Sequence, residues 1–129
     1  MGRGHDPNAG LLAGDLTDLE APRRGDIYWV DFDPVMGSEQ GGHRPACVIS
    51  LDSFNRNMPV VAVAAITTRI RESPLTVFLP QGRPLEKASM ILPFQVRTVD
   101  QTRLEDFAGE LSLEQIGALE AKLRLCWGL

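Results

Sequence analysis

The residues of this chain best suited to chemistry stand where apolar runs begin or end. Arg44 directly precedes the apolar run that starts at Pro45, and Thr67 and Thr68 directly follow the apolar run 60–66. Neighbouring strands of a small barrel can bring such ends within a side chain's length of each other. This arrangement would allow Arg44 to meet Thr67 at one end of a sheet.

An arginine beside a hydroxyl group is well suited to holding a phosphate. The guanidinium is planar, always charged and carries five N–H donors. Donors aimed at charge that develops in a transition state can lower a barrier by about 3 to 4 kcal/mol. The spacing also allows a plain alternative, in which Arg44 pairs with Glu39 at the surface and the two threonines only cap a turn.

Other catalytic signatures are absent from the sequence. It contains no G-x-S-x-G, no H-E-x-x-H, no P-loop and no Rossmann glycine pattern. One of its two histidines, His5, falls in the N-terminal stretch that we expect to lie outside the core. The two cysteines, Cys47 and Cys126, form no C-x-x-C motif and have no histidine cluster beside them, so we expect no metal ion or other cofactor.

Length and composition indicate one soluble domain. The chain has 129 residues, of which 43% are hydrophobic, and no apolar stretch is long enough to span a membrane. It shows no signal-peptide pattern, so we expect a cytoplasmic protein without a membrane partner. The net charge of −4 speaks against nucleic-acid binding when taken alone, but residues 67–103 carry six basic residues against three acidic ones. A local basic groove therefore stays open.

The strand signals predict a β-rich domain. Residues 1–22 lack a sustained hydrophobic period, and we expect a flexible extension there, followed by the folded domain 23–129. Six short runs, rich in β-branched and other apolar residues, are separated by turn residues and predict strands at 27–32, 45–50, 60–66, 75–79, 89–92 and 95–99. Six such strands are typical of a small barrel or of two packed sheets.

The C-terminal end has the pattern of an amphipathic helix over roughly 112–126. Ser112 and Gln115 match a capping box, in which each side chain satisfies a backbone N–H of the first turn. Ile116, Leu119 and Leu123 follow at three- and four-residue steps, which places them on one face. We expect this face to close one side of the barrel.

Several short blocks give the chain a resemblance to a known family. The blocks are RGDIYWV at 24–30, DP at 33–34, GSEQGGHRP at 37–45, FNR at 54–56, AIT at 65–67 and QVRTVD at 95–100. In order and spacing they are similar to those of the MazF/PemK family of toxin endoribonucleases, and they extend the resemblance over roughly 23–129.

The resemblance implies a fold, an activity and two partners. The fold would be an SH3-like small barrel of the CcdB/PemK type, mainly β, with a C-terminal α-helix. The protein would be a homodimer that cuts single-stranded mRNA at short sequences without a metal, and a MazE-like antitoxin would block its site. The RNA's own 2′-hydroxyl would attack the adjacent phosphate, leaving a 2′,3′-cyclic phosphate and a 5′-hydroxyl.

The resemblance also assigns residues. Arg44 and Thr67 match the catalytic pair of the family. The other residues expected to contact RNA are Ser38, Gln40, Asn55, Arg56, Thr68, Arg69, Phe94, Gln95 and Arg97. The glycines of 37–42 would let that loop close over the bound strand.

One departure from the family bears on the general base. Several relatives carry an acidic residue directly before the Gln of the last block and an arginine two residues before that acid; here Phe94 and Leu92 stand at those positions. Glu39 or His43 could act instead, or the loop could position the 2′-hydroxyl without a strong base. Phe94 offers either a ring on which a base could stack or a core side chain.

A non-enzymatic function stays open beside the nuclease. CcdB-type toxins, which share the implied fold, inhibit DNA gyrase by binding it. Fold alone does not separate the two activities. The R-P step at Arg44 and the I-T step at Thr67 favour the nuclease.

Overall fold

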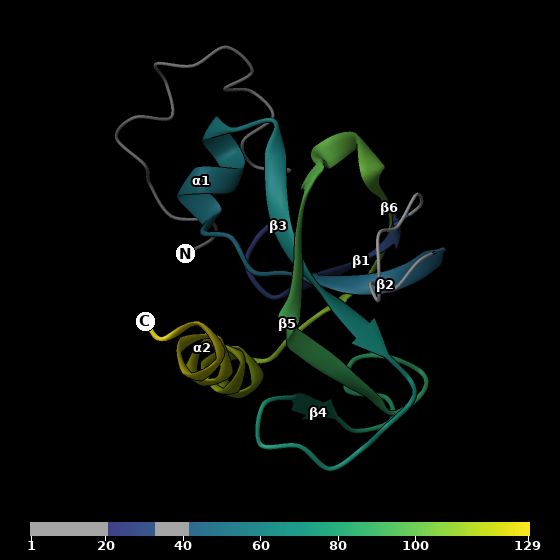
Figure 1. Cartoon of the computed structure of the whole chain (residues 1–129). Coiled ribbons are helices and arrows are strands. Elements are labelled where there is room, and N and C mark those ends of the chain that lie inside the picture. The colour runs from purple at the N-terminus through teal and green to yellow at the C-terminus, as the bar shows by residue number, and fades with distance from the viewer. Residues whose placement is uncertain (1–20, 33–41) are drawn as a thin grey trace.

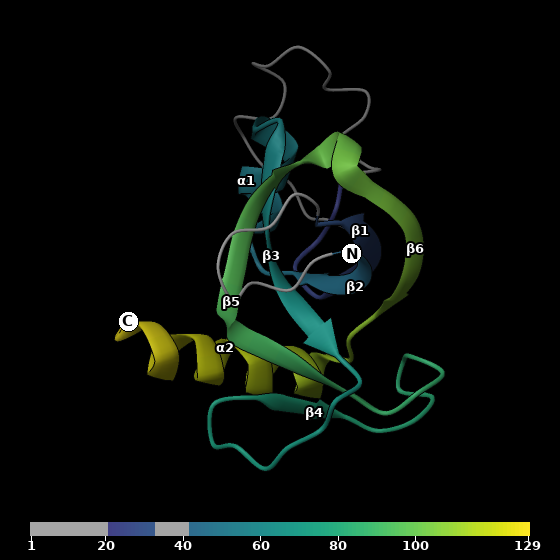
Figure 2. The same cartoon turned by 45° about the vertical axis from the view of Figure 1, so that its right-hand side comes forward.

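One curled antiparallel sheet with a helix packed against it makes up the domain (Figures 1 and 2). The computed structural model describes residues 21–32 and 42–129. Its strands and helices are β1 (Asp26–Asp31), β2 (His43–Val48), α1 (Asp52–Asn57), β3 (Val60–Thr67), β4 (Val77–Leu79), β5 (Ser89–Asp100), the 3-10 helix η3 (Gln101–Arg103), β6 (Leu104–Glu110) and α2 (Leu113–Trp127). The strands lie in the order β4-β5-β3-β2-β1-β6, which confirms the mainly β fold with a C-terminal helix. Within the described residues, neither helix combines the length and apolarity that crossing a bilayer demands.

Strand β5 replaces two of the predicted strands. It pairs with β3, but the register shifts between Ala64, which pairs with Val96, and Ala65, which pairs with Leu92. Three residues around Pro93 therefore bulge out of the ladder. Proline has no N–H to donate, so a proline inside a strand requires such an irregularity. Pro93, which separates the predicted strands 89–92 and 95–99, therefore marks a bulge within one strand.

Strand β6 has no counterpart among the predicted strands. Its sequence, LEDFAGE, contains three carboxylates, and most of its residues are exposed. It is an edge strand whose pairing with β1 shifts register twice. Edge strands often carry charge and irregularities that discourage further pairing, and these features erase the hydrophobic alternation by which a strand is recognised.

The sheet is buried on both faces by two separate clusters. On one face Ile27, Ile66 and Ile91 pack with Leu119 of α2. On the other face Val30, Phe32, Val48 and Val63 pack against one another where the sheet curls. The capping box of α2 is confirmed, because Ser112 and Gln115 bond each other's backbone N–H groups. The predicted apolar face of α2 is confirmed as part of the core.

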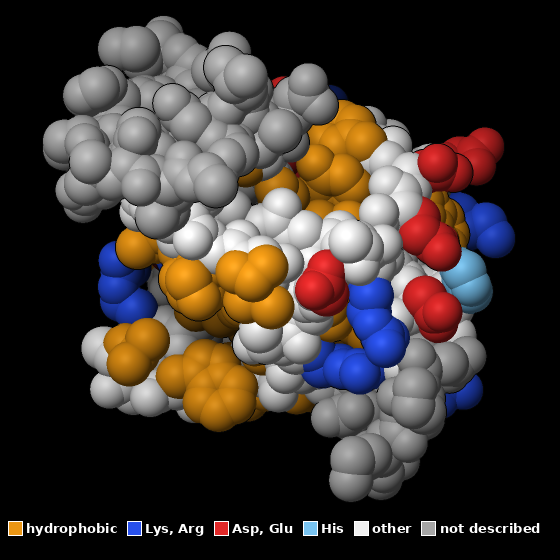
Figure 3. Space-filling view, turned by 90° about the horizontal axis from the view of Figure 1, so that it is seen from above, with side chains coloured by type: hydrophobic (Ala, Val, Ile, Leu, Met, Phe, Trp, Pro, Cys, Tyr) orange, Lys and Arg blue, Asp and Glu red, His pale blue; other side chains and the backbone are white. Residues whose placement is uncertain are grey.

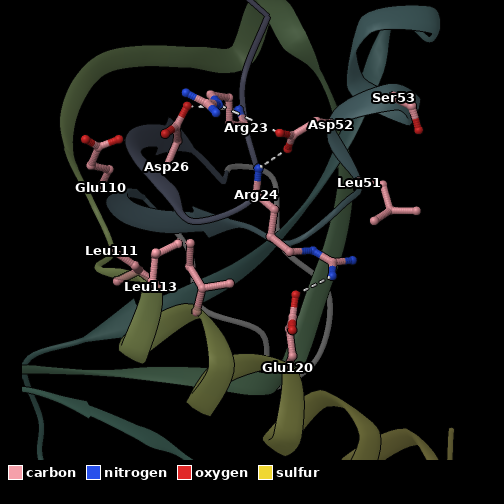
Figure 4. A pocket seen from close by; sticks show the side chains of 11 residues that line it. Arg23, Arg24, Asp26, Leu51, Asp52, Ser53, Glu110, Leu111, Leu113 and Glu120 are labelled. Carbon is pink, nitrogen blue, oxygen red and sulfur yellow. Dashed lines mark hydrogen bonds and ion pairs between the residues drawn. The ribbon is translucent and has the colours of Figure 1, made fainter. Parts of the chain in front are cut away.

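Arg24 ties three elements together (Figure 4). Its backbone N–H donates to Asp52 Oδ1 at the start of α1, at 2.8 Å. Its Nε donates to the Ile49 carbonyl at 2.6 Å, and its guanidinium bonds Glu120 Oε2 of α2 at 3.0 Å. A hollow of about 640 Å³ lies around these groups. The arginine thus joins the two helices to the end of β2.

We expect Arg24→Met to lower the free energy of unfolding by about 1 to 3 kcal/mol, because it removes a partly buried ion pair and a charged hydrogen bond. Urea unfolding monitored by circular dichroism measures the change. Arg23→Met is the matched control: the Arg23 Nε lies 3.7 Å from Asp52, at a more exposed position. Its loss should cost less than about 0.5 kcal/mol. Equal losses in the two variants would contradict the role given to Arg24.

Candidate functional site

Arg44 and Thr67 lie on the same face of the sheet, where two strands part. Arg44 of β2 shares the face of Ala46, and Thr67, the last residue of β3, shares the face of Ala65, because side chains alternate along a strand. The ladder joins Ala46 to Ala65 and ends there, two residues short of both polar groups. Beyond this pair β3 runs on beside β5 and away from β2 (Figure 1). A ligand at this opening would lie between a guanidinium and a hydroxyl.

Thr67 is held in place by the turn that follows it. Its side chain is buried to 9% exposure, and its Oγ1 accepts a hydrogen bond from the backbone N–H of Arg69 at 3.1 Å. Thr67 therefore caps the turn after β3, as the alternative without a ligand site predicted. The same bond orients the hydroxyl and directs its proton away from Arg69. Capping thus also fixes a donor next to the opening.

Four of the predicted site residues line one hollow of about 340 Å³ beside this opening. They are Thr67, Arg69, Phe94 and Gln95. The rest of the lining is Arg71, Glu72, Ser73, Thr76, Met90 and Leu92. We call this space the β3–β5 hollow, because the loop after β3 forms one wall and β5 the other. Its floor is apolar and its rim carries two arginines.

Sequence reasoning missed several members of the β3–β5 hollow. Met90 lies in a run that predicted only a strand, and it forms a small buried cluster with Ala65 and Leu92, of which Leu92 is one of the departures from the family pattern. Ser73 and Thr76 belong to a loop without any motif. The signal that could have pointed to them is their position between Thr67 and the next strand, since that segment must return past the end of β3.

His43 points away from Arg44. Its Nδ1 lies 2.9 Å from Glu105 Oε1 of β6, and the two side chains meet at the exposed edge of the sheet. In the space-filling view the histidine stands beside carboxylates (Figure 3). Consecutive residues of a strand face opposite sides. This arrangement does not support His43 as a base for a phosphate held by Arg44.

The structure does not support Asn55 as an RNA contact. It is 1% exposed, and its Nδ2 donates to the carbonyls of Pro22 and Ser50 at 2.9 and 3.1 Å. Helix α1 precedes the first residue of β3, whereas Thr67 is its last, and eight strand residues span roughly 23 Å. Asn55 therefore anchors the N-terminal segment. Arg56 lies on the same helix, in its last turn.

Two further predicted contacts lie apart from the β3–β5 hollow. Arg97 donates to the Phe32 carbonyl at 2.5 Å and stacks over the Phe32 ring at 5.5 Å, so it holds the end of β1. Thr68 lines a different hollow, of about 440 Å³, beside Trp29 and Pro45. The predicted residues Ser38, Glu39 and Gln40 fall outside the described residues.

The cysteines offer no activated thiol at this site. Cys47 is fully buried, and burial, with the Asp26 charge as a smaller cause, raises the pKa of its thiol to about 12. The nucleophilic form is the thiolate, so Cys47 is inert at neutral pH. Within 21–32 and 42–129, no three residues among His, Cys, Asp and Glu are grouped to hold a metal ion.

Comparison with known proteins gives consistent matches. The family model described as "PemK-like, MazF-like toxin of type II toxin-antitoxin system" matches residues 23–126. A protein of Staphylococcus saprophyticus named Endoribonuclease MazF is 41% identical over 110 residues, which are 83% of this chain and 92% of that protein. The crystal structure of MazF from Deinococcus radiodurans has a TM-score of 0.74 at 27% identity, covering 84% of this chain and 98% of its own. An endoribonuclease from a mycobacterial species, solved with its cognate antitoxin, has a TM-score of 0.74 at 25% identity, covering 84% of this chain and 97% of its own.

We expect iodoacetamide at pH 7 to modify Cys126 and to leave Cys47 unmodified in the folded protein, because Cys126 is partly exposed whereas the Cys47 thiol is protonated and enclosed. Peptide mass spectrometry after a timed quench measures both sites. Unfolding in urea should make the two cysteines react at similar rates. Rapid native-state labelling of Cys47 would show that this part of the core opens.

Proposed function

The chain belongs to the family of PemK-like, MazF-like toxins of type II toxin-antitoxin systems, and on this premise we propose that it is an endoribonuclease that cuts single-stranded mRNA at short, specific sequences. The relative from Staphylococcus saprophyticus, named Endoribonuclease MazF, supports the proposal through its 41% identity over most of both chains. The observation that carries it is the position of Arg44 and Thr67 on one face, where β2 and β3 part. The predicted family resemblance is confirmed by the family model and by this relative.

The proposed reaction uses the RNA's own nucleophile. The 2′-oxygen forms a bond to the adjacent phosphorus, and the bond from phosphorus to the 5′-oxygen of the next nucleotide breaks. The attacking hydroxyl gives up one proton and the leaving oxygen takes up one, so the products are a 2′,3′-cyclic phosphate and a 5′-hydroxyl. Arg44 neutralises the charge that develops on the phosphoryl oxygens, and the Thr67 hydroxyl donates to one of them. Holding the three reacting atoms in line supplies much of the rate.

The base that accepts the 2′-proton does not come from β5. Leu92 is buried in the floor of the β3–β5 hollow, and Phe94 presents a ring. His43 bonds Glu105 on the other face. Glu39, four residues before the start of β2 in the sequence, is the base that we propose. A modest contribution from this group is sufficient if positioning carries most of the acceleration.

We propose two protein partners. A second copy of the chain would cover the large apolar side chains exposed at the end of α2, which are Leu125, Trp127 and Leu129. A MazE-like antitoxin would lay an acidic or apolar segment across the opening at Arg44. The mycobacterial relative solved with its cognate antitoxin supports the second partner.

We expect the wild-type protein to cut a long single-stranded RNA at discrete sites in excess chelator, as a metal-independent reaction requires. The new ends should carry cyclic phosphates and 5′-hydroxyls, mapped by end-specific ligation and sequencing. Arg44→Ala should slow cutting about 100- to 1000-fold, because it removes the charge nearest the phosphate. Thr67→Val should also slow it, through the loss of the donor.

His43→Gln is the matched control for Arg44→Ala, because it changes the neighbouring residue on the opposite face; its cutting rate should stay within about threefold of wild type. Cutting that requires added metal would contradict the proposed reaction. A folded wild-type protein that cuts no RNA but inhibits gyrase would favour the CcdB-like alternative, for which no described residue gives specific support.

A further inference from the structure

One helix holds both walls of the β3–β5 hollow from behind. On the loop wall, Lys122 Nζ donates to the Pro74 carbonyl, and Cys126 Sγ lies 3.8 Å from the Leu75 carbonyl. On the strand wall, Trp127 Nε1 donates to the Pro93 carbonyl at 2.9 Å. These three residues come from the last two turns of α2, which lies along β4 and β5 (Figure 2). The separation of the two walls therefore depends on α2.

The loop wall is also fastened from inside the hollow. The Met90 sulfur accepts from the backbone N–H of Arg71 and from the Thr76 hydroxyl, at 3.5 Å each. Ser73 Oγ accepts from the Leu75 N–H at 3.1 Å. These bonds give the segment between β3 and β4 a defined shape. The hollow is thus a preformed space.

The lining fits a nucleotide of single-stranded RNA. Proteins bind splayed-out bases by stacking them on aromatic rings and by placing cationic groups on the backbone phosphates. Phe94 presents a ring that is 43% exposed, above a floor of buried Met90 and Leu92. Arg69 and Arg71 stand at the rim with one carboxylate, Glu72, so the rim is net positive. The apolar floor and the cationic rim match the two ends of a nucleotide.

We propose that the β3–β5 hollow takes one unstacked base of the RNA, with its phosphate at Arg69 and Arg71, and that α2 sets the width of the hollow and so helps to select the base. The inference rests on the proposed function, because it takes RNA as the ligand. Phe94 is the residue that touches the base. Lys122 and Trp127 are positioning residues, since they act through the backbone of the two walls.

A randomised pool of short 2′-O-methyl RNA tests base selection without cleavage. The pool is incubated with the purified wild-type protein, and the bound RNA is recovered and sequenced. The sequences give the enrichment of each base at each position. We expect a clear preference at one position. Phe94→Leu keeps the apolar volume but removes the ring, and it should weaken binding of the preferred sequence about 5- to 150-fold. No positional preference in wild type, or an unchanged preference in Phe94→Leu, would overturn the proposal.

Variants of α2 test the part played by the helix. Trp127→Phe and Lys122→Met each remove one donor, and each should reduce the preference at that same position about 2- to 10-fold and leave other positions unchanged. Lys122→Arg keeps a donor at this position and should retain the wild-type base preference. Arg124→Met is the control, because it removes a charge from the same exposed stretch of the helix. If these variants lower the base preference equally at all positions, or do not lower it, the positioning role is overturned. Measurement of the molecular mass in solution checks that the variants assemble as the wild type does.

The outcomes for this inference and for the proposed function can be told apart. A preference that depends on Phe94, in a protein that cuts no natural RNA, would support the base-selecting hollow and contradict the nuclease. Discrete cutting of natural RNA, together with no loss of preference in Phe94→Leu, would support the nuclease and overturn the base-selecting hollow.

Discussion

The bulge at Pro93 is the constraint on which the site depends. Proline cannot donate to the ladder, so the pairing of β3 with β5 shifts between Ala64 and Ala65. The shift lets the strand bend, and the sheet curls at this point (Figure 2). It also leaves the Pro93 carbonyl available to Trp127. Without the bulge, neither the Phe94 wall nor its attachment to α2 would have its present position.

The same bend explains why β3 is firmly packed in its middle but separates from β2 at its end. Near the middle of β3 both faces are buried, which fixes the strand firmly. At its end β3 leaves β2, and the opening holds Arg44 on one side and Thr67 on the other. Groups attached to rigid strands keep their geometry better than groups on loops. The opening thus combines access for a chain-like ligand with fixed donors.

The position of Arg44 and Thr67 at the ends of apolar runs let the sequence predict that both lie where strands begin or end, and the capping box predicted α2. Asn55 and Arg97 were different, because a motif does not tell a residue that builds the fold from one that touches a ligand. The side-chain amide of Asn55 donates its hydrogen bonds to backbone carbonyls of its own domain. Strand β6 and the Met90 contacts were missed because edge strands and thioether acceptors leave no periodic signal.

The apolar residues Leu92 and Phe94 change which chemical groups are available at the site. An acidic residue at position 94 and an arginine at position 92 would bring a base and a cation to the β3–β5 hollow. Here the floor is formed by the buried side chains of Met90 and Leu92, which carry no charge. A site built in this way depends more on where the RNA is held than on proton transfer, which is why the walls of the hollow matter for the chemistry.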